Sequence, residues 1–284
     1  MNTSFKVFFV YTDAYFHKFY YFCCMMHYQL FEAHKNLVSF TTERYGGVSV
    51  GNYQSLNLCH YVNDNPEHVA RNRQLVCNQL DIDAAQLIFP RQTHSNHLLV
   101  IDEKFLKLTA KKQTALLEGV DALITAQKSL CIGINTADCV PVLLFDPERN
   151  VIAVAHAGWR GTVARIAAKT AQQMIQDFQC RAENLLVAIG PSISAANYEV
   201  SNDVLAEFVK ADFPTGKCFT KAPNSDKLQL DLWAANRWQL EELGILPEHI
   251  EVAGICTFDQ ADTYFSARKL GIHSGRIASC LMMK

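Results

Sequence analysis

The distribution of apolar and polar positions predicts a chain of short buried strands separated by helices. Apolar runs that turn signals bound at both ends are typical of strands covered on both faces. Strands of this kind are expected at residues 87–89, 98–101, 121–125, 131–134, 140–145, 151–156 and 185–189. The glycine-rich segment 44–58, with its alternating valines, predicts a strand pair joined by a tight turn.

Helices are predicted between these strands. The run Asn65-Pro66-Glu67 starts one, because Asn caps a helix and Pro is tolerated in its first turn. Apolar residues at helical spacing predict others over residues 161–178, 201–211 and 231–243. No repeat or linker divides the chain. The sequence therefore predicts one α/β domain (α+β in its strand order) over residues 29–284, with mixed β-sheets flanked by helices.

Residues 1–28 differ from the rest because they are dense in Phe and Tyr. Asp13, His17 and Lys18 interrupt the apolar run that a signal peptide or a membrane anchor would need. Our hypothesis is that these residues are an N-terminal extension from a misassigned start, with Met25 or Met26 as the natural first residue. The alternative is a terminal strand packed on the domain.

Composition excludes several classes of protein. The 26 Lys and Arg residues against 28 Asp and Glu residues give a formal net charge of −2, so nucleic acid is not an expected partner. No apolar stretch reaches the roughly 18 residues of a membrane-spanning helix. Ten cysteines without any C-x-x-C pair predict buried thiols in a reducing cytoplasm rather than disulfides. Nothing in the sequence sets an oligomeric state.

Candidate chemistry lies where predicted strands end, in loops that carry reactive side chains. His94, Cys139 and His156 stand in three such loops. Two imidazoles and one thiolate would make a three-ligand zinc site with a fourth position open. These residues are far apart in the sequence, however, so their spacing does not require them to lie close together in the fold. Each also fits an ordinary core or loop position. The residues alone therefore leave the metal site open.

The loop after His156 carries a second signal. Residues 158–162 join a predicted strand to a helix, and Arg160 lies in the turn. Free N–H groups at a helix start and a guanidinium favour phosphate or carboxylate. The alternative is that Arg160 pairs with a neighbouring acid.

Several motifs occur in the order found in the YfiH family, whose older name is polyphenol oxidase. They are G-G-V-S at 46–49, S-L-N-L at 55–58, N-R at 72–73, R-Q-T-H at 91–94, D-A-L-I-T at 121–125, T-A-D-C-V-P-V-L-L at 136–144, A-H-A-G-W-R-G-T at 155–162, G-P-S-I at 190–193, Y-E-V at 198–200, D-L-W at 231–233, C-T at 256–257, Y-F-S-A-R at 264–268 and G-R at 275–276. The chain resembles this family from about residue 44 to residue 281.

The resemblance implies a zinc-dependent purine nucleoside enzyme with an α/β sandwich fold like that of YfiH. Family members phosphorolyse adenosine, inosine, guanosine and 5′-methylthioadenosine, and they deaminate adenosine. The implied zinc ligands are His94, Cys139 and His156. The implied partners are purine nucleosides and phosphate, and bacterial members are also linked to peptidoglycan fidelity.

The resemblance also suggests roles for neighbouring residues. Asp138 is a candidate for proton transfer to the leaving purine or, equally, for orienting a ligand histidine. Substrate or phosphate contacts are expected from Arg160, Ser49, Asn57 and Arg268. Two positions depart from the usual pattern: Ser95 replaces a glycine, and Lys269 replaces a second arginine.

Two other functions stay open. One is a cysteine or zinc hydrolase that edits peptidoglycan precursors, with Cys139 as nucleophile and His156 as base. The other is a protein that binds a nucleoside or peptide without turnover. A copper oxidase is disfavoured because the sequence has no H-x-H pair. The P-C-x-x-C half of the zinc nucleobase deaminase signature is also absent.

Overall fold

Strands β7 (Val140–Asp146) and β8 (Val151–Ala157) form the centre of the fold, and every residue in them is buried. The computed structural model describes residues 25–222 and 227–284. In it the two strands pair antiparallel, from Val140 opposite Ala157 to Asp146 opposite Val151. Their alternate side chains enter two different hydrophobic clusters, one on each face. This two-sided burial explains why both strands are continuous apolar runs.

Three sheets organise the strands around this pair. The remaining strands are β1 (Met25–Met26), β2 (Leu37–Thr42), β3 (Leu87–Ile88), β4 (Leu98–Val100), β5 (Ala122–Thr125), β6 (Cys131–Thr136), β9 (Leu186–Ile189), β10 (Glu199–Val200), β11 (Phe219–Lys221), β12 (Leu228–Leu230), β13 (Ile250–Val252) and β14 (Ile277–Met283). The largest sheet has the order β13-β9-β7-β8-β5-β4. A second has the order β1-β2-β14-β6-β3, and a small third sheet the order β10-β12-β11.

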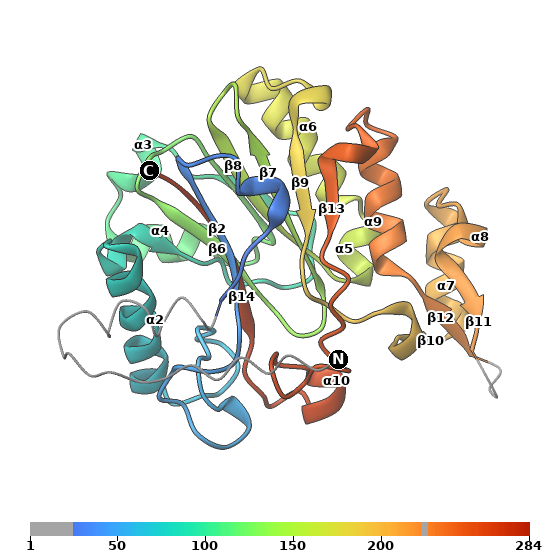
Figure 1. Ribbon diagram of the computed structural model, residues 1–284, viewed down its shortest axis with the longest axis horizontal. Coiled ribbons are helices and arrows are strands. Elements are labelled where there is room, and N and C mark those ends of the chain that lie inside the picture. Colours follow the sequence, from blue (N-terminus) through green and yellow to red (C-terminus); the bar gives the residue numbers. More distant parts are fainter. Residues whose placement is uncertain (1–24, 223–226) are drawn as a thin grey trace, which may run out of the picture.

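Helices connect and flank the strands of these sheets. They are α2 (Pro66–Leu80), α3 (Glu103–Leu106), α4 (Ala110–Leu116), α5 (Trp159–Val163), α6 (Ile166–Phe178), α7 (Asn202–Lys210), α8 (Thr215–Cys218), α9 (Leu232–Glu241) and α10 (Ala267–Leu270). Short 3-10 helices cover Gln29–Phe31, Gly51–Tyr53, Ala84–Gln86, Ala182–Asn184, Ala195–Asn197 and Pro247–His249. In Figure 1, α2 lies at one side of the sheets, and α6 and α9 lie at the other.

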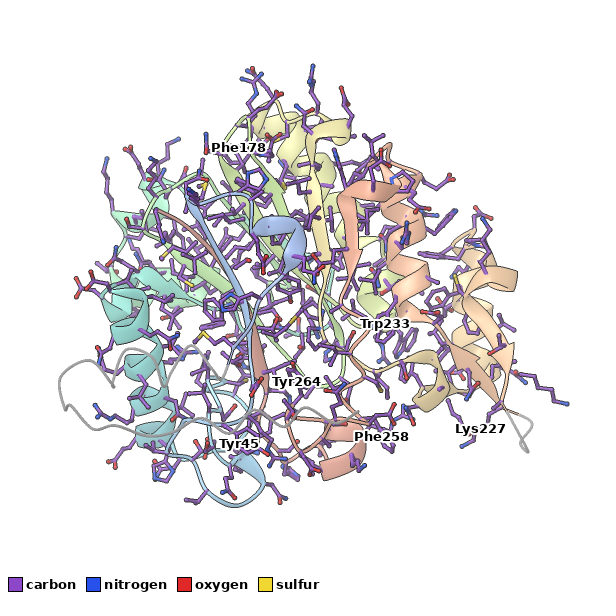
Figure 2. The ribbon with its side chains drawn as sticks, in the orientation of Figure 1. Tyr45, Phe178, Lys227, Trp233, Phe258 and Tyr264 are labelled. Atoms are coloured by element: carbon purple, nitrogen blue, oxygen red, sulfur yellow. The ribbon has the colours of Figure 1, made fainter. Side chains whose placement is uncertain are left out.

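The cores between these layers define a four-layer α/β sandwich. Apolar side chains of α6 and α9 pack on one face of the six-stranded sheet. Its other face packs on β6 and β14 of the five-stranded sheet, and α2 covers the outer face of that sheet. Side chains fill the space between the layers (Figure 2). The predicted α/β fold with mixed sheets and flanking helices is therefore confirmed.

The individual strand predictions from residue 87 to residue 189 are confirmed to within a few residues. The helix predicted at Asn65 is α2, where the Asn65 side chain accepts a hydrogen bond from the Glu67 N–H. The two predicted helices at 201–211 and 231–243 are α7 and α9.

The helix predicted over residues 161–178 is confirmed as α6 from residue 166 onward. Its first turn belongs to the separate helix α5, because the helix breaks at Arg165. This residue has a left-handed backbone with φ of 60°. Its guanidinium stacks on Phe213 and Trp238 and donates to the Ala211 carbonyl. These contacts with other elements accompany the break, which helical periodicity does not reveal.

The strand pair predicted over residues 44–58 is also wrong. The segment is irregular apart from the 3-10 helix Gly51–Tyr53, and side chains satisfy part of its backbone. The buried Asn72 of α2 accepts from the Val48 N–H and donates to the carbonyls of Ser55 and Asn57. A Cβ on Gly47 would lie 2.2 Å from the Ser55 oxygen, so glycine here permits a close chain crossing.

The N-terminal prediction falls mostly on residues 1–24, which lie outside the described residues. Met25 and Met26 form β1, which pairs with β2. Tyr28 is fully buried, and its hydroxyl lies 2.6 Å from Thr41 Oγ1. Residues 25–28 therefore pack on the domain as a terminal strand would, and the position of the natural start stays a prediction.

The described cysteines are free, and all except the partly buried Cys139 are buried. This confirms the predicted buried thiols for that part of the chain, whereas Cys23 and Cys24 lie outside it. Within residues 25–222 and 227–284, each helix is too short or too polar to cross a bilayer.

We predict that Asn72→Ala lowers the free energy of unfolding by about 2–4 kcal/mol, because it leaves several buried backbone groups without a partner. Urea unfolding of the purified protein measures this change. The control is Asn78→Ala on the exposed face of the same helix, where the amide contacts only Gln74. An equal, small effect of both changes would contradict the role of Asn72 in holding residues 44–58.

Candidate metal centre

The candidate centre is built on the carboxylate of Asp121, which is fully buried at the start of β5. It accepts hydrogen bonds from the backbone N–H groups of Thr93, His94 and Ser95, at 3.1, 3.0 and 2.8 Å. The Ser95 hydroxyl lies 2.7 Å from the same carboxylate. These bonds hold His94 in a left-handed conformation, with φ of 62°, and fix the loop that carries it.

The same carboxylate orients His156. Asp121 Oδ1 lies 2.7 Å from His156 Nδ1. Burial alone would raise the pKa of Asp121, but the bonds and charge from His156 and Ser95 outweigh it and hold the pKa at about 2. Asp121 is therefore ionised and can only accept, so Nδ1 carries the proton. Nε2 of His156 is then left to bind a metal.

Neighbouring strands bring the remaining donors together. Cys139 directly precedes β7, and His156 stands opposite Pro141 in β8. The donor atoms of His94, Cys139 and His156 lie within 4.8 Å of one another. They form the one His, Cys, Asp and Glu group with this property in residues 25–222 and 227–284. The structure therefore brings together the three residues that the strand-end argument selected.

The charges in this group favour a thiolate. Burial raises the pKa of Cys139, but nearby His156 and His94 outweigh it and lower the pKa to about 6. Burial lowers the pKa of His156, whereas Cys139 and Asp121 outweigh it and raise the pKa to about 9. Thiolate is the form in which cysteine binds metals.

Gly158 keeps the space between the donors open. A Cβ at this position would lie 2.8 Å from Cys139 Sγ and 3.1 Å from His94 Cδ2. Two imidazoles and a thiolate that converge on a space free of a side chain fit a metal ion that takes nitrogen and sulfur ligands.

A cavity of about 330 Å³ opens beside Cys139, and Asp138, Tyr198 and Arg268 line it. Asp138 accepts hydrogen bonds from the Thr257 hydroxyl at 2.6 Å and from the backbone N–H of Arg268 at 2.8 Å. The Arg268 guanidinium lies 5.2 Å from the centre of the Tyr198 ring. The cavity thus places a carboxylate, a cation and an aromatic face next to the metal donors.

The other predicted site residues do not line this cavity, although Arg160 is close enough to Tyr198 to act on the pKa of its hydroxyl. Arg160 is exposed in the single turn of α5 and stacks on Trp159 at 4.3 Å. Ser49 and Asn57 are buried, and both donate to Asp64, at 2.7 and 2.9 Å. They brace the irregular segment 44–58, do not line the cavity described above, and their contact with substrate stays a prediction.

Sequence reasoning missed four contributors to the site: Asp121, Gly158, Tyr198 and Thr257. All four stand inside the motifs quoted above, but residues of these types at such positions have no signature that distinguishes them. The departure at Ser95 has a structural role, because its hydroxyl bonds Asp121.

Comparison with known proteins decides the family. A family model described as multi-copper polyphenol oxidoreductase laccase matches residues 38–284. The chain belongs to this family. Its similarity to YfiH from Bacillus licheniformis, a hypothetical protein of known structure, has a TM-score of 0.83 at 28% identity and covers 92% of this chain and 97% of that one. The predicted family and its fold are therefore confirmed.

Curated relatives of this chain have the names of enzymes that act on nucleosides, although the family description names a laccase. A purine nucleoside phosphorylase of Bacteroides thetaiotaomicron is 40% identical over 259 residues, which cover 91% of this chain and 96% of the relative. Adenosine deaminase RL5, from an unknown prokaryotic organism, is 42% identical over 224 residues, which cover 79% and 85%.

We predict that Asp121→Asn weakens binding of added Zn²⁺ by about 10- to 100-fold. In the native protein the hydrogen-bond donors share two carboxylate oxygens, whereas the amide of the variant offers them only one acceptor oxygen. Titration against a competing chelator measures the affinity. Asp102→Asn is the matched control, since Asp102 only caps α3 and Asn caps equally well. Unchanged affinity in Asp121→Asn would contradict the orienting role.

Gly158→Ala is expected to reduce Zn²⁺ binding at least about tenfold, because the new methyl group enters the space between Cys139 and His94. Gly216→Ala is the control, since a Cβ there meets nothing within 4 Å. Metal content after dialysis and circular dichroism of both variants separate loss of the site from loss of the fold. A Gly158→Ala protein that keeps full metal content would overturn this interpretation.

Proposed function

We propose that the chain is a zinc-dependent purine nucleoside phosphorylase that also deaminates adenosine. The observation that carries the proposal is the convergence of His94, Cys139 and His156 beside a cavity lined by Asp138 and Arg268. The names of its relatives support the same reaction class. Expected substrates are adenosine, inosine, guanosine and 5′-methylthioadenosine, each with phosphate.

Zinc is the metal we assign to the three donors. Imidazole and thiolate ligands suit zinc, and a three-ligand zinc site is typical of catalysis because a position stays open. When bound, the ion would supply Lewis-acid chemistry and a fixed positive charge.

The chain's own residues would then bind and orient the reactants. Arg268, at the rim of the cavity, is placed to hold phosphate. Tyr198 offers an aromatic face, and burial raises the pKa of its hydroxyl, so it stays protonated. Asp138 is fixed by Thr257 and by the Arg268 N–H, and we assign it the transfer of a proton to the leaving purine. The carboxylate that orients His156 is Asp121, so Asp138 is free for this role.

A cysteine hydrolase is the second candidate, and one observation favours it. Asp121, His156 and Cys139 are arranged as an acid, a base and a nucleophile, and the Asp121–His156 bond of 2.7 Å would orient the base. A hydrolase of this type acting on peptidoglycan precursors would need no metal.

Oxidation by several copper ions is not proposed, although the family description names it. The part of the chain that the structure describes holds one cluster of three metal-binding side chains. Multi-copper chemistry needs several such clusters.

The test combines metal analysis with an assay of adenosine in the presence and absence of phosphate. We expect about one zinc per chain, adenine formed only with phosphate, and some inosine formed without it. Cys139→Ala should lose metal and both activities. Cys180→Ala is the matched control, because this thiol is buried near Asp146 at the opposite end of β7.

Two results would contradict the proposal. Full activity of the metal-free protein on a peptide substrate, abolished by alkylation of Cys139, would establish the hydrolase instead. A zinc-loaded protein that binds nucleosides without converting any of them would make it a binding protein.

A further inference from the structure

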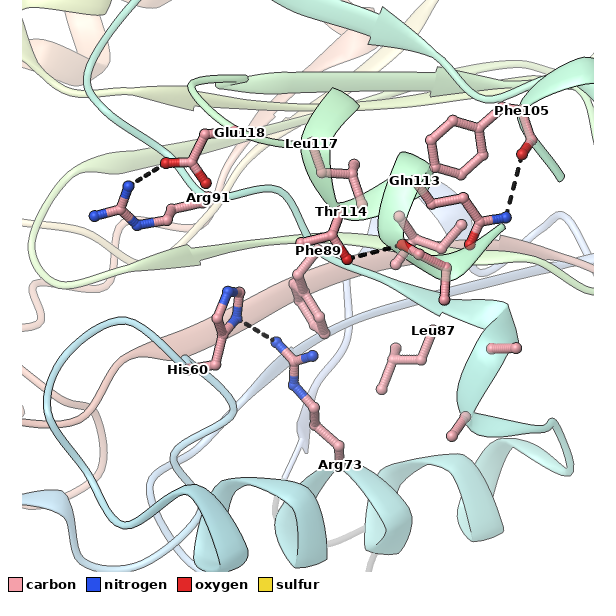
Figure 3. Close-up of a pocket in the computed structure, with 14 residues that line it drawn as sticks. His60, Arg73, Leu87, Phe89, Arg91, Phe105, Gln113, Thr114, Leu117 and Glu118 are labelled. Carbon is pink, nitrogen blue, oxygen red and sulfur yellow. Dashed lines mark hydrogen bonds and ion pairs between the residues drawn. The ribbon is translucent and has the colours of Figure 1, made fainter. Parts of the chain in front are cut away.

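A second cavity, of about 350 Å³, lies between α2, β3 and α4 (Figure 3). It shares no lining residue with the cavity beside Cys139. Its size is within the range of small-molecule sites in proteins. The proposed nucleoside chemistry gives it no role.

Arg73 of α2 projects into this cavity (Figure 3). Its Nε donates to the Leu58 carbonyl at 2.9 Å, an Nη lies 3.1 Å from His60 Nδ1, and the guanidinium stacks on Phe89 at 5.2 Å. Among residues 25–222 and 227–284, no carboxylate lies within ion-pair distance of Arg73. Burial lowers the pKa of Arg73, as expected of a cation removed from water without an anion.

The other charges around the cavity do not compensate Arg73. Glu118 is already paired with Arg91 at the rim. Partial burial, Arg73 and Arg91 together lower the pKa of His60, so His60 is neutral at neutral pH and accepts from Arg73 through Nδ1. The lining therefore carries one uncompensated positive charge.

The rest of the lining is mainly apolar. Leu87, Phe89, Phe105 and Leu117 supply aliphatic and aromatic surface, and Gln113 adds an amide that donates to the Phe105 carbonyl. A bare inorganic ion would leave this surface unused. A ligand with a charged group and an apolar body would use both.

We propose that this cavity binds a small organic anion, a carboxylate or phosphate monoester carried on an apolar ring or chain. The anionic group pairs with Arg73, and the apolar body packs against Phe89 and Leu117. The two possible anionic groups share this chemistry, and the experiment below distinguishes them.

The cavity is close to the metal centre in sequence. Arg91 lies three residues before His94, and Glu118 lies three residues before Asp121. A change at the rim can therefore reach the metal ligands through the backbone. For this reason the zinc content of each variant is measured together with its ligand affinity.

The experiment measures binding of 4-fluorobenzoate and 4-fluorophenyl phosphate by fluorine NMR, with neutral 4-fluorobenzamide for comparison. We expect at least one anion to bind at least about tenfold more tightly than the amide. The tighter of the two identifies the preferred anionic group. Equal or absent binding of all three probes would overturn the proposal.

Charge-changing variants then locate the site. Arg73→Gln should weaken anion binding at least about tenfold. Glu118→Gln should strengthen it about threefold, because the exposed Arg91 loses its partner. Because Glu118→Gln is expected to raise the affinity rather than lower it, the proposal can still be tested if Arg73→Gln does not fold.

Two controls complete the set. Arg71→Gln removes an exposed cation from the same helix and should leave affinity unchanged. Arg268→Gln removes the cation beside the metal centre and should also leave it unchanged. Loss of binding in Arg268→Gln would place the anion in the first cavity, and weaker binding in Glu118→Gln would show that the rim charge does not act as proposed.

Discussion

The buried carboxylate of Asp121 is the interaction on which the metal centre depends. An isolated charge in a protein interior is costly, and here hydrogen bonds from the 93–95 backbone, Ser95 and His156 offset that cost. The same bonds tie an exposed loop to the end of a buried strand. One ionised group therefore fixes both the position of His94 and the orientation of His156.

The central strand pair supplies the rigidity that the loops lack. Because β7 and β8 are buried on both faces, the positions of Cys139 and His156 follow from strand register rather than from local sequence. His94 reaches them from a loop before β4, and Gly158 leaves the space in which their donor atoms meet. A precise cluster thus arises from segments far apart in the chain.

The sequence predicts best where burial dominates. Apart from the partly exposed edge strand β4, the strands from residue 87 to residue 189 appear as apolar runs because both of their faces are covered. Segment 44–58 was mispredicted because Asn72, a residue of another element, satisfies its backbone. Arg165 interrupts a periodic helix, and strands β10 to β12 of the small third sheet are too short to give a pattern. Strand ends and family motifs predict the metal donors. They do not predict the role of Asp121, although this residue lies in the D-A-L-I-T motif, because its five hydrogen-bond donors come together only in the folded chain.

The same side chains support two reaction classes, and occupancy by a metal decides between them. When Cys139 binds a metal, its thiolate donates to the ion and is a poor nucleophile. The reaction would then take place in the neighbouring cavity with Asp138 and Arg268. Without a metal, the thiolate faces His156, itself held by Asp121, as a nucleophile faces its base. Gly158 bears on both cases, because the space it leaves beside Cys139 Sγ can hold an atom that bonds to the sulfur, whether a metal ion or a substrate carbon. The Arg268 cation favours an anionic reactant there, which phosphorolysis requires and simple hydrolysis does not.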